Sequence, residues 1–344
     1  MHLEMVLTKV FVFFRSLPDT YTEGFHDVED LKRMPYRSLG ITGLRVSALS
    51  FGASSLGSVF RATDDAESAQ VLTHAIKSGI NYVDTAPWYG HGKSETVLGK
   101  NLPSIPRSSY YLATKVGRYL PEVDKMFDFS AERTLRSVDE SLARLNVDYV
   151  DIIQADSRRL PNYETVYLKA IYSVLYDSGL KTVLERSSVK IDAILTYCRG
   201  SMNDNSLKDW LPYFKDKGVG VVNASPISMG LLTSRGPPQW HPAKPHIKEA
   251  CANAASYCKE QGVDISRLGL RFTLDQEDIP TTLVSTASLE NLKKNLQCVY
   301  DPLTEQEQQV LQDVMSKFMS PLNNANWEGV ELANYKKELA ESQK

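Results

Sequence analysis

The chain has 344 residues, of which 42% are hydrophobic and 24% charged, and its formal net charge is −3. This length allows a large core, either one domain of about 250 residues with extensions or two domains. The slightly acidic net charge gives no sign of the basic surface that binds nucleic acid. No apolar run reaches the ~20 residues of a membrane span. We therefore expect neither a nucleic-acid nor a membrane partner.

Residues 1–35 are predicted to form an irregular N-terminal extension. The apolar run 10–14 has only five residues and no small-residue cleavage pattern after it, which argues against a targeting signal. The cysteines (Cys198, Cys251, Cys258 and Cys298) show no C-x-x-C or Cys/His spacing. We therefore expect reduced structural thiols, no metal site and a cytoplasmic location.

Short apolar segments alternate with amphipathic ones along the rest of the chain. Strands are predicted over 46–51, 80–84, 110–115, 149–154, 192–197, 218–223 and 281–284. Helices are predicted over 65–77, 94–101, 162–177, 180–187, 246–261, 264–275 and 288–297, and after Ser130 with the apolar stripe Leu135, Val138, Leu142 and Leu145. Asp64 or Asp65 is the expected N-cap of the first of these helices. This alternation predicts a parallel α/β architecture.

A closed (β/α)8 TIM barrel is favoured over a doubly wound sheet, because no G-x-G-x-x-G follows the first strand. The barrel domain is predicted over 36–315, followed by a C-terminal extension, 316–344. Only seven barrel strands are predicted, since none lies between the helices expected at 162–177 and 180–187. Strand number and shear are linked in a closed barrel. The missing strand therefore either opens the wall or leads to recruitment of another segment.

Three polar residues are candidates for catalysis at the carboxyl ends of the strands. Asp84 ends a strand, Tyr89 follows five residues later in the loop, and Lys115 ends the next strand. An ammonium group beside a phenol favours the phenolate, and a carboxylate holds the ammonium in place. Such a trio can exchange a proton with a carbonyl oxygen while a hydride is transferred. The spacing alone equally allows Asp84 to cap the next helix and Lys115 to be solvated.

Several stretches resemble the aldo-keto reductase superfamily, in particular its L-galactose/D-arabinose dehydrogenase-like branch. They are Asn-Tyr-Val-Asp-Thr-Ala-Pro-Trp-Tyr-Gly at 81–90, Ala-Thr-Lys-Val-Gly at 113–117, Val-Asp-Ile-Ile-Gln at 150–154 and the segment 223–232. The resemblance covers about 35–300. It implies a (β/α)8 barrel, NADP or NAD bound without a Rossmann motif, and a tetrad of Asp, Tyr, Lys and His. Asp84, Tyr89 and Lys115 match the first three members.

The sequence departs from the family pattern in two places. Asp156 stands at the position of the tetrad histidine, and His91, near Tyr89, is better explained as a solvent-facing loop residue than as a substitute. About a dozen residues that carry the fifth strand in relatives are absent between Gly179 and Leu180. A neutral Asp156 could donate to a carbonyl, whereas an ionised one would oppose a developing oxyanion.

The resemblance also implies residues that bind cofactor and substrate. The cofactor set is Gly52, Ala53, Gln154, Ser225, Pro226, Ile227, Gly230, Leu231, Ser285 and Thr286, with Asn291, Lys294 and Asn295 near the adenine. Without the resemblance, Ser225-Pro226 would equally fit an ordinary loop. Lys294 stands where many relatives have an acid, so the choice between NADP and NAD stays open. Trp88, and Trp240 in the insert 233–247, are the expected substrate contacts.

The expected function is NAD(P)-dependent interconversion of a small aldehyde, ketone or sugar and its alcohol. The alternative is a catalytically silent protein of the same ancestry, favoured by the missing histidine and the missing strand. The sequence indicates no oligomeric state.

Overall fold

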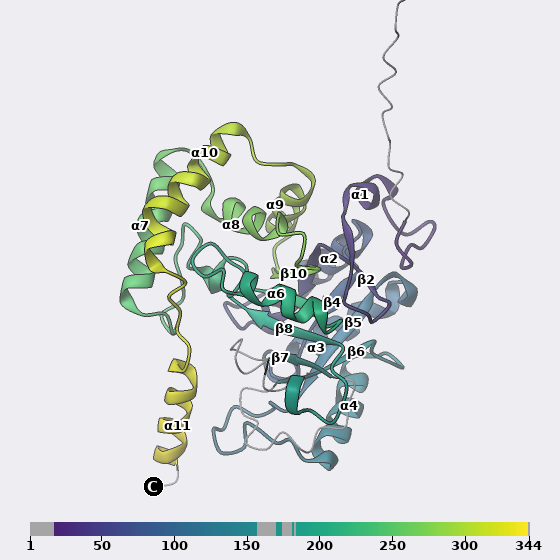
Figure 1. Cartoon of the computed structure of the whole chain (residues 1–344). Helices are drawn as coiled ribbons and strands as arrows, with labels where there is room; N and C mark the ends of the chain where they lie inside the picture. The colour runs from purple at the N-terminus through teal and green to yellow at the C-terminus, as the bar shows by residue number, and fades with distance from the viewer. Residues whose placement is uncertain (1–16, 157–169, 174–180, 182–183, 343–344) are drawn as a thin grey trace, which may run out of the picture.

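The computed structural model describes residues 17–156, 170–173, 181 and 184–342 (Figure 1). Within them, eight strands pair in parallel and close into a barrel in the order β10-β3-β4-β5-β6-β7-β8-β9. The strands are β3 (Leu49–Gly52), β4 (Tyr82–Asp84), β5 (Tyr111–Val116), β6 (Ile152–Asp156), β7 (Ala170–Ser173), β8 (Ala193–Tyr197), β9 (Gly220–Ala224) and β10 (Thr281–Ser285). The predicted (β/α)8 class is confirmed.

The place of the missing strand is taken by β7, a strand of four residues. It pairs through Ile171 with Gln154 of β6 and with Ala193 of β8. The helix predicted over 162–177 is wrong at 170–173, and the rest of that prediction lies outside the described residues. An open wall between β6 and β8 would leave two rows of backbone N–H and C=O groups unpaired. Pairing with β7 satisfies the backbone groups of β6 and β8 and closes the barrel.

The N-terminal end of the barrel is covered by a hairpin. β1 (Tyr36–Ser38) pairs antiparallel with β2 (Arg45–Ser47), so the strand predicted over 46–51 is divided between β2 and β3. Leu39 and Val46 of this hairpin belong to the same buried cluster as Tyr82 inside the barrel. The hairpin therefore plugs the end of the barrel opposite the predicted site.

The extension 1–35 was predicted to be irregular, and this is wrong over α1 (Val28–Arg33). The Asp27 side chain accepts hydrogen bonds from the N–H groups of Glu29 and Asp30 and so caps α1. We propose 36–315 as the barrel domain, with α1 in the N-terminal extension and α11 (Val330–Ser342) in the C-terminal one.

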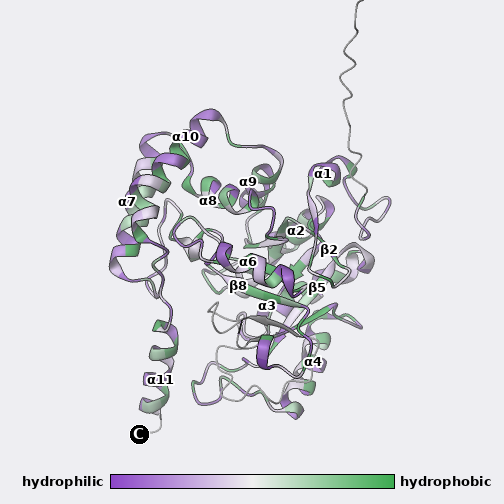
Figure 2. Ribbon diagram, in the orientation of Figure 1, coloured by the Kyte–Doolittle hydropathy of each residue, from purple (hydrophilic) through white to green (hydrophobic). Residues whose placement is uncertain are grey.

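Amphipathic helices lie around the barrel and bury their apolar faces against it or against one another; Figure 2 shows green, apolar residues along the strands and mixed colours on the helices. The helices are α2 (Asp65–Lys77), α3 (Lys93–Asn101), α4 (Ala131–Leu145), α6 (Leu207–Asp216), α7 (Pro245–Glu260), α8 (Ile265–Leu274), α9 (Leu289–Tyr300) and α10 (Glu305–Val314). Asp64 caps α2 and Ser130 caps α4, as predicted. In the predicted stripe of α4, Leu145 is buried but Leu135 is 65% exposed, so the stripe is wrong at its first position. Lys181 and residues 184–186 are helical, in agreement with the helix predicted there.

Gly99 of α3 allows a close crossing with α4. A Cβ at this position would overlap the carbonyl oxygen of Arg144. We expect Gly99→Ala to lower the free energy of unfolding by about 1–3 kcal/mol, since overpacking a tight contact costs this much. The measurement is urea unfolding. The control is Gly269→Ala in α8, where a Cβ meets ordinary contact distances, the nearest being 3.4 Å. The control should be neutral or stabilising by up to about 1 kcal/mol; equal losses in both variants would contradict the crossing argument.

Among the residues described, no helix has the length and apolar character that a membrane crossing requires.

Candidate active site

The carboxyl ends of β4 and β5 bring Asp84 and Lys115 together inside the barrel. The Lys115 ammonium donates to the Asp84 carboxylate through Nζ and Oδ1, and to the carbonyl oxygen of Thr85 at 3.0 Å. Lys115 is 5% and Asp84 2% exposed. The alternative reading, with Lys115 solvated and Asp84 capping the next helix, is therefore wrong. The N-cap of α3 is Gly92, which forms no side-chain cap.

Tyr89 lies in the loop between β4 and α3, beside this pair. The Lys115 Nζ is 5.4 Å from the centroid of the Tyr89 ring. The loop is placed by backbone contact with the short helix η1 (Ser54–Gly57), because a Cβ on Gly57 would lie 2.5 Å from the Tyr89 carbonyl oxygen. Gly90 approaches the carbonyl of Gly57 in the same way and has φ +65°. Two glycines thus set the position of the phenol relative to the ammonium.

Gln154 of β6 completes the hydrogen bonding of the Asp84 carboxylate. Its Nε2 donates to Asp84 Oδ2 and lies 3.4 Å from the Tyr82 hydroxyl. Burial raises the pKa of Tyr82 well above its usual range, and the charges of Asp84 and Tyr89 add to this effect. Tyr82 is therefore a neutral phenol, and each oxygen of the carboxylate faces a donor. The Oε1 of Gln154 is buried and has no hydrogen-bond partner among the described residues.

A second ion pair, which the sequence analysis missed, contacts β5 next to Lys115; its carboxylate is buried and its guanidinium side chain is 28% exposed. Glu95 of α3 is fully buried and accepts from Thr114 Oγ1 at 2.6 Å and from Arg144 Nε at 2.7 Å. Because Thr114 precedes Lys115 on β5, this network ties the strand that carries the lysine to α3 and α4. An acid one residue after Ser94, on the inner face of α3, was the available signal.

The position of the tetrad histidine falls at the end of β6. The backbone of Asp156 pairs with Ser173 of β7, and its side chain lies outside the described part of the chain. His91 is exposed and packs edge-on against Trp88, with ring centroids 4.8 Å apart. This placement agrees with the prediction of a loop histidine.

Several of the predicted cofactor residues lie at the carboxyl ends of the neighbouring strands β3, β9 and β10 or directly after them. Ser285, the last residue of β10, accepts from Ser55 N and donates to Ser55 Oγ, both at 2.8 Å. Gly52 packs beside it, since its Cβ would lie 3.5 Å from the Cβ of Ser285. Thr286 Oγ1 accepts from Ser288 N at 3.1 Å. These contacts bring Gly52, Ser285 and Thr286 to one edge of the barrel mouth.

Residues 225–232, here called the β9 turn, have an unusual backbone. Ser225, Ser228, Met229 and Gly230 have φ values of +60°, +48°, +51° and +100°. The turn holds the predicted residues Ser225, Pro226, Ile227, Gly230 and Leu231, of which Leu231 is buried. Ser225 N donates to the carbonyl of Leu283 at 3.3 Å, which links the turn to β10. Left-handed backbone at non-glycine residues is unfavourable and is concentrated at functional turns.

The start of α9, expected beside the adenine, carries a carboxylate. The Leu289 N–H donates to Oε1 of Glu67 from α2 at 3.2 Å, and Ser288 is the N-cap. Lys294 pairs with Glu290 at 2.6 Å. Asn291 is exposed and Asn295 half-buried on the same helix. One backbone N–H at the start of α9 therefore already donates to a carboxylate, and the Lys294 ammonium is paired with another.

The predicted substrate residues lie in two separate aromatic contacts. The Arg118 guanidinium lies 3.7 Å from the centroid of the Trp88 ring. Trp240 is 55% exposed and stacks on Phe60, with centroids 6.1 Å apart. The sequence reading missed both Arg118 and Phe60.

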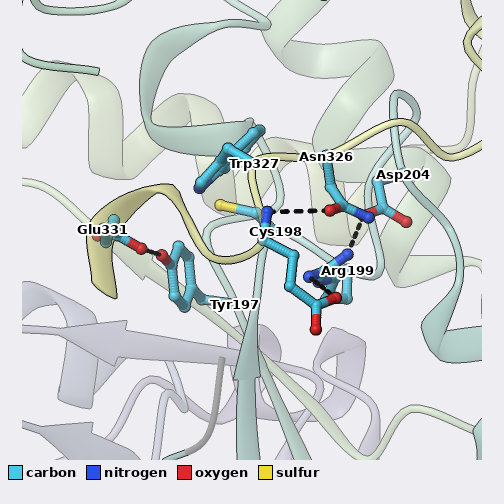
Figure 3. Close-up of a pocket in the computed structure, with 8 residues that line it drawn as sticks. Tyr197, Cys198, Arg199, Asp204, Asn326, Trp327 and Glu331 are labelled. Atoms are coloured by element: carbon cyan, nitrogen blue, oxygen red, sulfur yellow. Dashed lines mark hydrogen bonds and ion pairs between the residues drawn. The ribbon is translucent and has the colours of Figure 1, made fainter. Parts of the chain in front are cut away.

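A small pocket at the end of β8 was also not predicted. Figure 3 shows it between Tyr197 and Arg199 and the C-terminal segment with Trp327 and Glu331. The Tyr197 hydroxyl donates to Glu331 of α11, and Arg199 pairs with Asp204 at 2.9 Å. The C-terminal segment therefore borders the same end of the barrel as Asp84 and Lys115.

Searched over the described ranges, the chain has no group of three or more residues that could hold a metal ion. The four cysteines are free and buried, and burial raises the pKa of Cys251 to about 12.

Known proteins resemble the chain over most of its length. A model described as "Aldo/keto reductase family" matches residues 48–315. The L-galactose dehydrogenase of Arabidopsis thaliana is 40% identical, covering 86% of this chain and 98% of that protein. The D-arabinose 1-dehydrogenase of Saccharomyces cerevisiae is 29% identical, covering 72% and 81%. Among solved structures, the holo form of aldo-keto reductase AKR11C1 from Bacillus halodurans gives a TM-score of 0.62 at 27% identity, covering 82% and 96%.

Proposed function

The chain belongs to the aldo-keto reductase family, and we propose that it oxidises an aldose with a nicotinamide cofactor, using Tyr89, Lys115 and Asp84. The observation that supports this most strongly is the buried pair of Lys115 and Asp84 beside the Tyr89 ring. The ammonium favours the phenolate form of Tyr89, and Asp84 fixes the ammonium. Tyr89 then accepts the hydroxyl proton during oxidation, or donates it to the carbonyl oxygen during reduction.

The residues present fit a nicotinamide dinucleotide, which when bound supplies the hydride acceptor. Gln154 Oε1 is a buried acceptor with no partner in the described residues, and an amide N–H would satisfy it. The β9 turn and the hydroxyl groups of Ser285 and Thr286 lie at the same mouth and are proposed cofactor contacts. Gly52, Ala53, Asn291, Lys294 and Asn295 remain proposed contacts.

The substrate class is proposed from the relatives and from one contact in this chain. Three relatives have names of sugar dehydrogenases, among them the D-threo-aldose 1-dehydrogenase of Pseudomonas sp, 26% identical. A Trp ring stacks on the apolar face of a sugar and a guanidinium donates to hydroxyl groups, and Trp88 with Arg118 supplies both. Trp240 is proposed as a second aromatic contact of the substrate. Asp156 is proposed to replace the tetrad histidine, as a donor when neutral.

The charges at the start of α9 favour NAD over NADP. A carboxylate accepts hydrogen bonds from a ribose diol and repels a 2′-phosphate. Glu67 holds a carboxylate at this helix start, and Glu290 engages Lys294. A cytoplasmic location remains a proposal, supported by the four free, buried cysteines.

Thermal unfolding with and without cofactor tests both whether the chain binds a nicotinamide cofactor and whether it prefers NAD to NADP. NADH at 100 times its dissociation constant should add ~2.7 kcal/mol and raise the Tm by a few degrees, with a smaller shift for NADPH. Glu67→Gln should reduce the preference for NADH by about tenfold. Asp65→Asn should not change it, because Asp65 is an exposed acid of the same helix that faces Lys100 of α3 and not α9. No Tm shift with either cofactor in a cooperatively folded protein would favour the silent alternative. A larger shift with NADPH in the unchanged chain would contradict the role of Glu67.

A further inference from the structure

The β9 turn needs support from outside itself. Ser228 and Met229 both have left-handed backbone, with φ of +48° and +51°. Left-handed backbone at residues other than glycine is unfavourable and persists only where the surroundings hold it. On one side, the Ser228 hydroxyl donates to Asn203 Oδ1 at 2.6 Å and lies 3.0 Å from Ser201 Oγ. These contacts hold the side chain of Ser228, and its carbonyl oxygen accepts from Leu231 N within the turn at 3.2 Å.

A second partner of the Ser228 carbonyl is His241, which comes from the insert after the turn. Its Nε2 lies 3.1 Å from the Ser228 carbonyl oxygen, and its Nδ1 accepts from the Ala243 N–H at 3.1 Å. The two contacts determine the tautomer: Nδ1 faces a donor and carries no proton, so Nε2 carries it and donates to Ser228. His241 is a neutral imidazole that satisfies two backbone groups.

The surroundings of the ring favour this neutral form. His241 is 3% exposed and packs edge-on against Trp327, with centroids 4.9 Å apart. Burial lowers the pKa of His241, and Lys248 of α7 lowers it further. The hydrogen bond to Ser228 and the charge of Glu331 in α11 act in the opposite direction, and the lowering dominates. A second proton would also place an N–H at Nδ1 against the N–H of Ala243.

We propose that neutral His241 is a positioning residue that holds the β9 turn in its cofactor-binding shape, and that protonation of the ring releases the turn. The proposal rests on the proposed function, because the turn is taken to bind the dinucleotide. His241 joins the turn to the insert through the Ser228 carbonyl, and to the C-terminal segment through Trp327.

The pH dependence follows from the direction of the pKa shift. Above about pH 6.5, His241 is neutral whether the turn is held or released. The hydrogen bond from His241 to Ser228 then stabilises the held form of the turn fully. As the pH falls below that value, the released form takes up a proton and the held form does so less readily. The support is therefore lost on acidification, and NADH affinity should fall with it.

The test is the dissociation constant for NADH, measured by fluorescence titration from pH 8 to pH 5.5. NADH is used because it lacks the 2′-phosphate, which itself titrates in this range. In the unchanged protein the constant should rise by up to about tenfold per pH unit below 6.5. His241→Gln keeps a donor toward Ser228 and cannot titrate, so its affinity should be independent of pH. His246→Gln, at an exposed position in α7, is the matched control and should behave as the unchanged protein.

Deuterium exchange of the 225–232 amides without cofactor gives a second readout. At pH 5.5 these amides should exchange faster in the unchanged protein than in His241→Gln, and at pH 8 the two should be equal. A pH dependence of NADH affinity that persists in His241→Gln, or equal exchange at pH 5.5, would overturn the proposal. Failure to bind NADH at pH 8 would instead count against the proposed function, and the exchange experiment would still decide the role of His241.

Discussion

Replacing Tyr89 with phenylalanine is expected to lower kcat for aldose oxidation by about 10²- to 10⁴-fold, since this is what a general acid or base contributes. The ring still occupies the same space beside Lys115 Nζ, so folding and NADH binding should be retained. Only the phenolic hydroxyl group, which carries the exchangeable proton, is removed. The measurement is steady-state turnover with a panel of aldoses at saturating NAD.

Tyr149→Phe is the matched control, because Tyr149 is 51% exposed and stacks on Arg107 at the opposite end of the barrel. It should change kcat by less than about twofold, as surface substitutions usually do little. Equal turnover of Tyr89→Phe and the unchanged enzyme would remove Tyr89 from the mechanism. An unchanged protein that binds NADH but turns over no aldose would support the silent alternative.

Local sequence signals were sufficient for most of the fold. The caps Asp64 and Ser130 and seven of the barrel strands were predicted because they depend on side chains within a few residues. β7 could not be predicted, because its conformation is determined by pairing with β6 and β8 and not by its own pattern. α6 was also missed, since Pro212 inside it reads as a helix breaker.

The candidate site likewise contains residues that a local sequence motif identifies and residues that only the fold brings together. Asp84, Tyr89 and Lys115 lie on motifs that the sequence displays, and the parallel register brings the first and last together. Glu67 and Leu289 are 222 residues apart in sequence, so no local signal connects the carboxylate with the start of α9. His241 looked like one polar residue in a loop insert. Its tautomer and its bond to Ser228 depend on a fold that buries it beside Trp327.

Breaking the ion pair of Lys115 and Asp84 is expected to have the largest effect on stability. Lys115→Met should lower the free energy of unfolding by about 3–5 kcal/mol, because a buried carboxylate loses its counter-charge. Gln154 would still donate to Asp84, but a neutral amide does not compensate a full charge. Urea unfolding measures the loss, and turnover of the variant should also fall sharply because nothing then favours the Tyr89 phenolate.

A second substitution separates the two effects. In Lys115→Met with Asp84→Asn, the buried charge is gone together with its partner, so most of the lost stability should return. Turnover should not return, because the ammonium that acts on Tyr89 is still missing. If the double variant is as unstable as Lys115→Met, the loss comes from packing around the lysine stem and not from the uncompensated carboxylate. If the double variant recovers turnover along with stability, Lys115 has only a structural role, and the assignment of the lysine as the group that tunes Tyr89 is wrong.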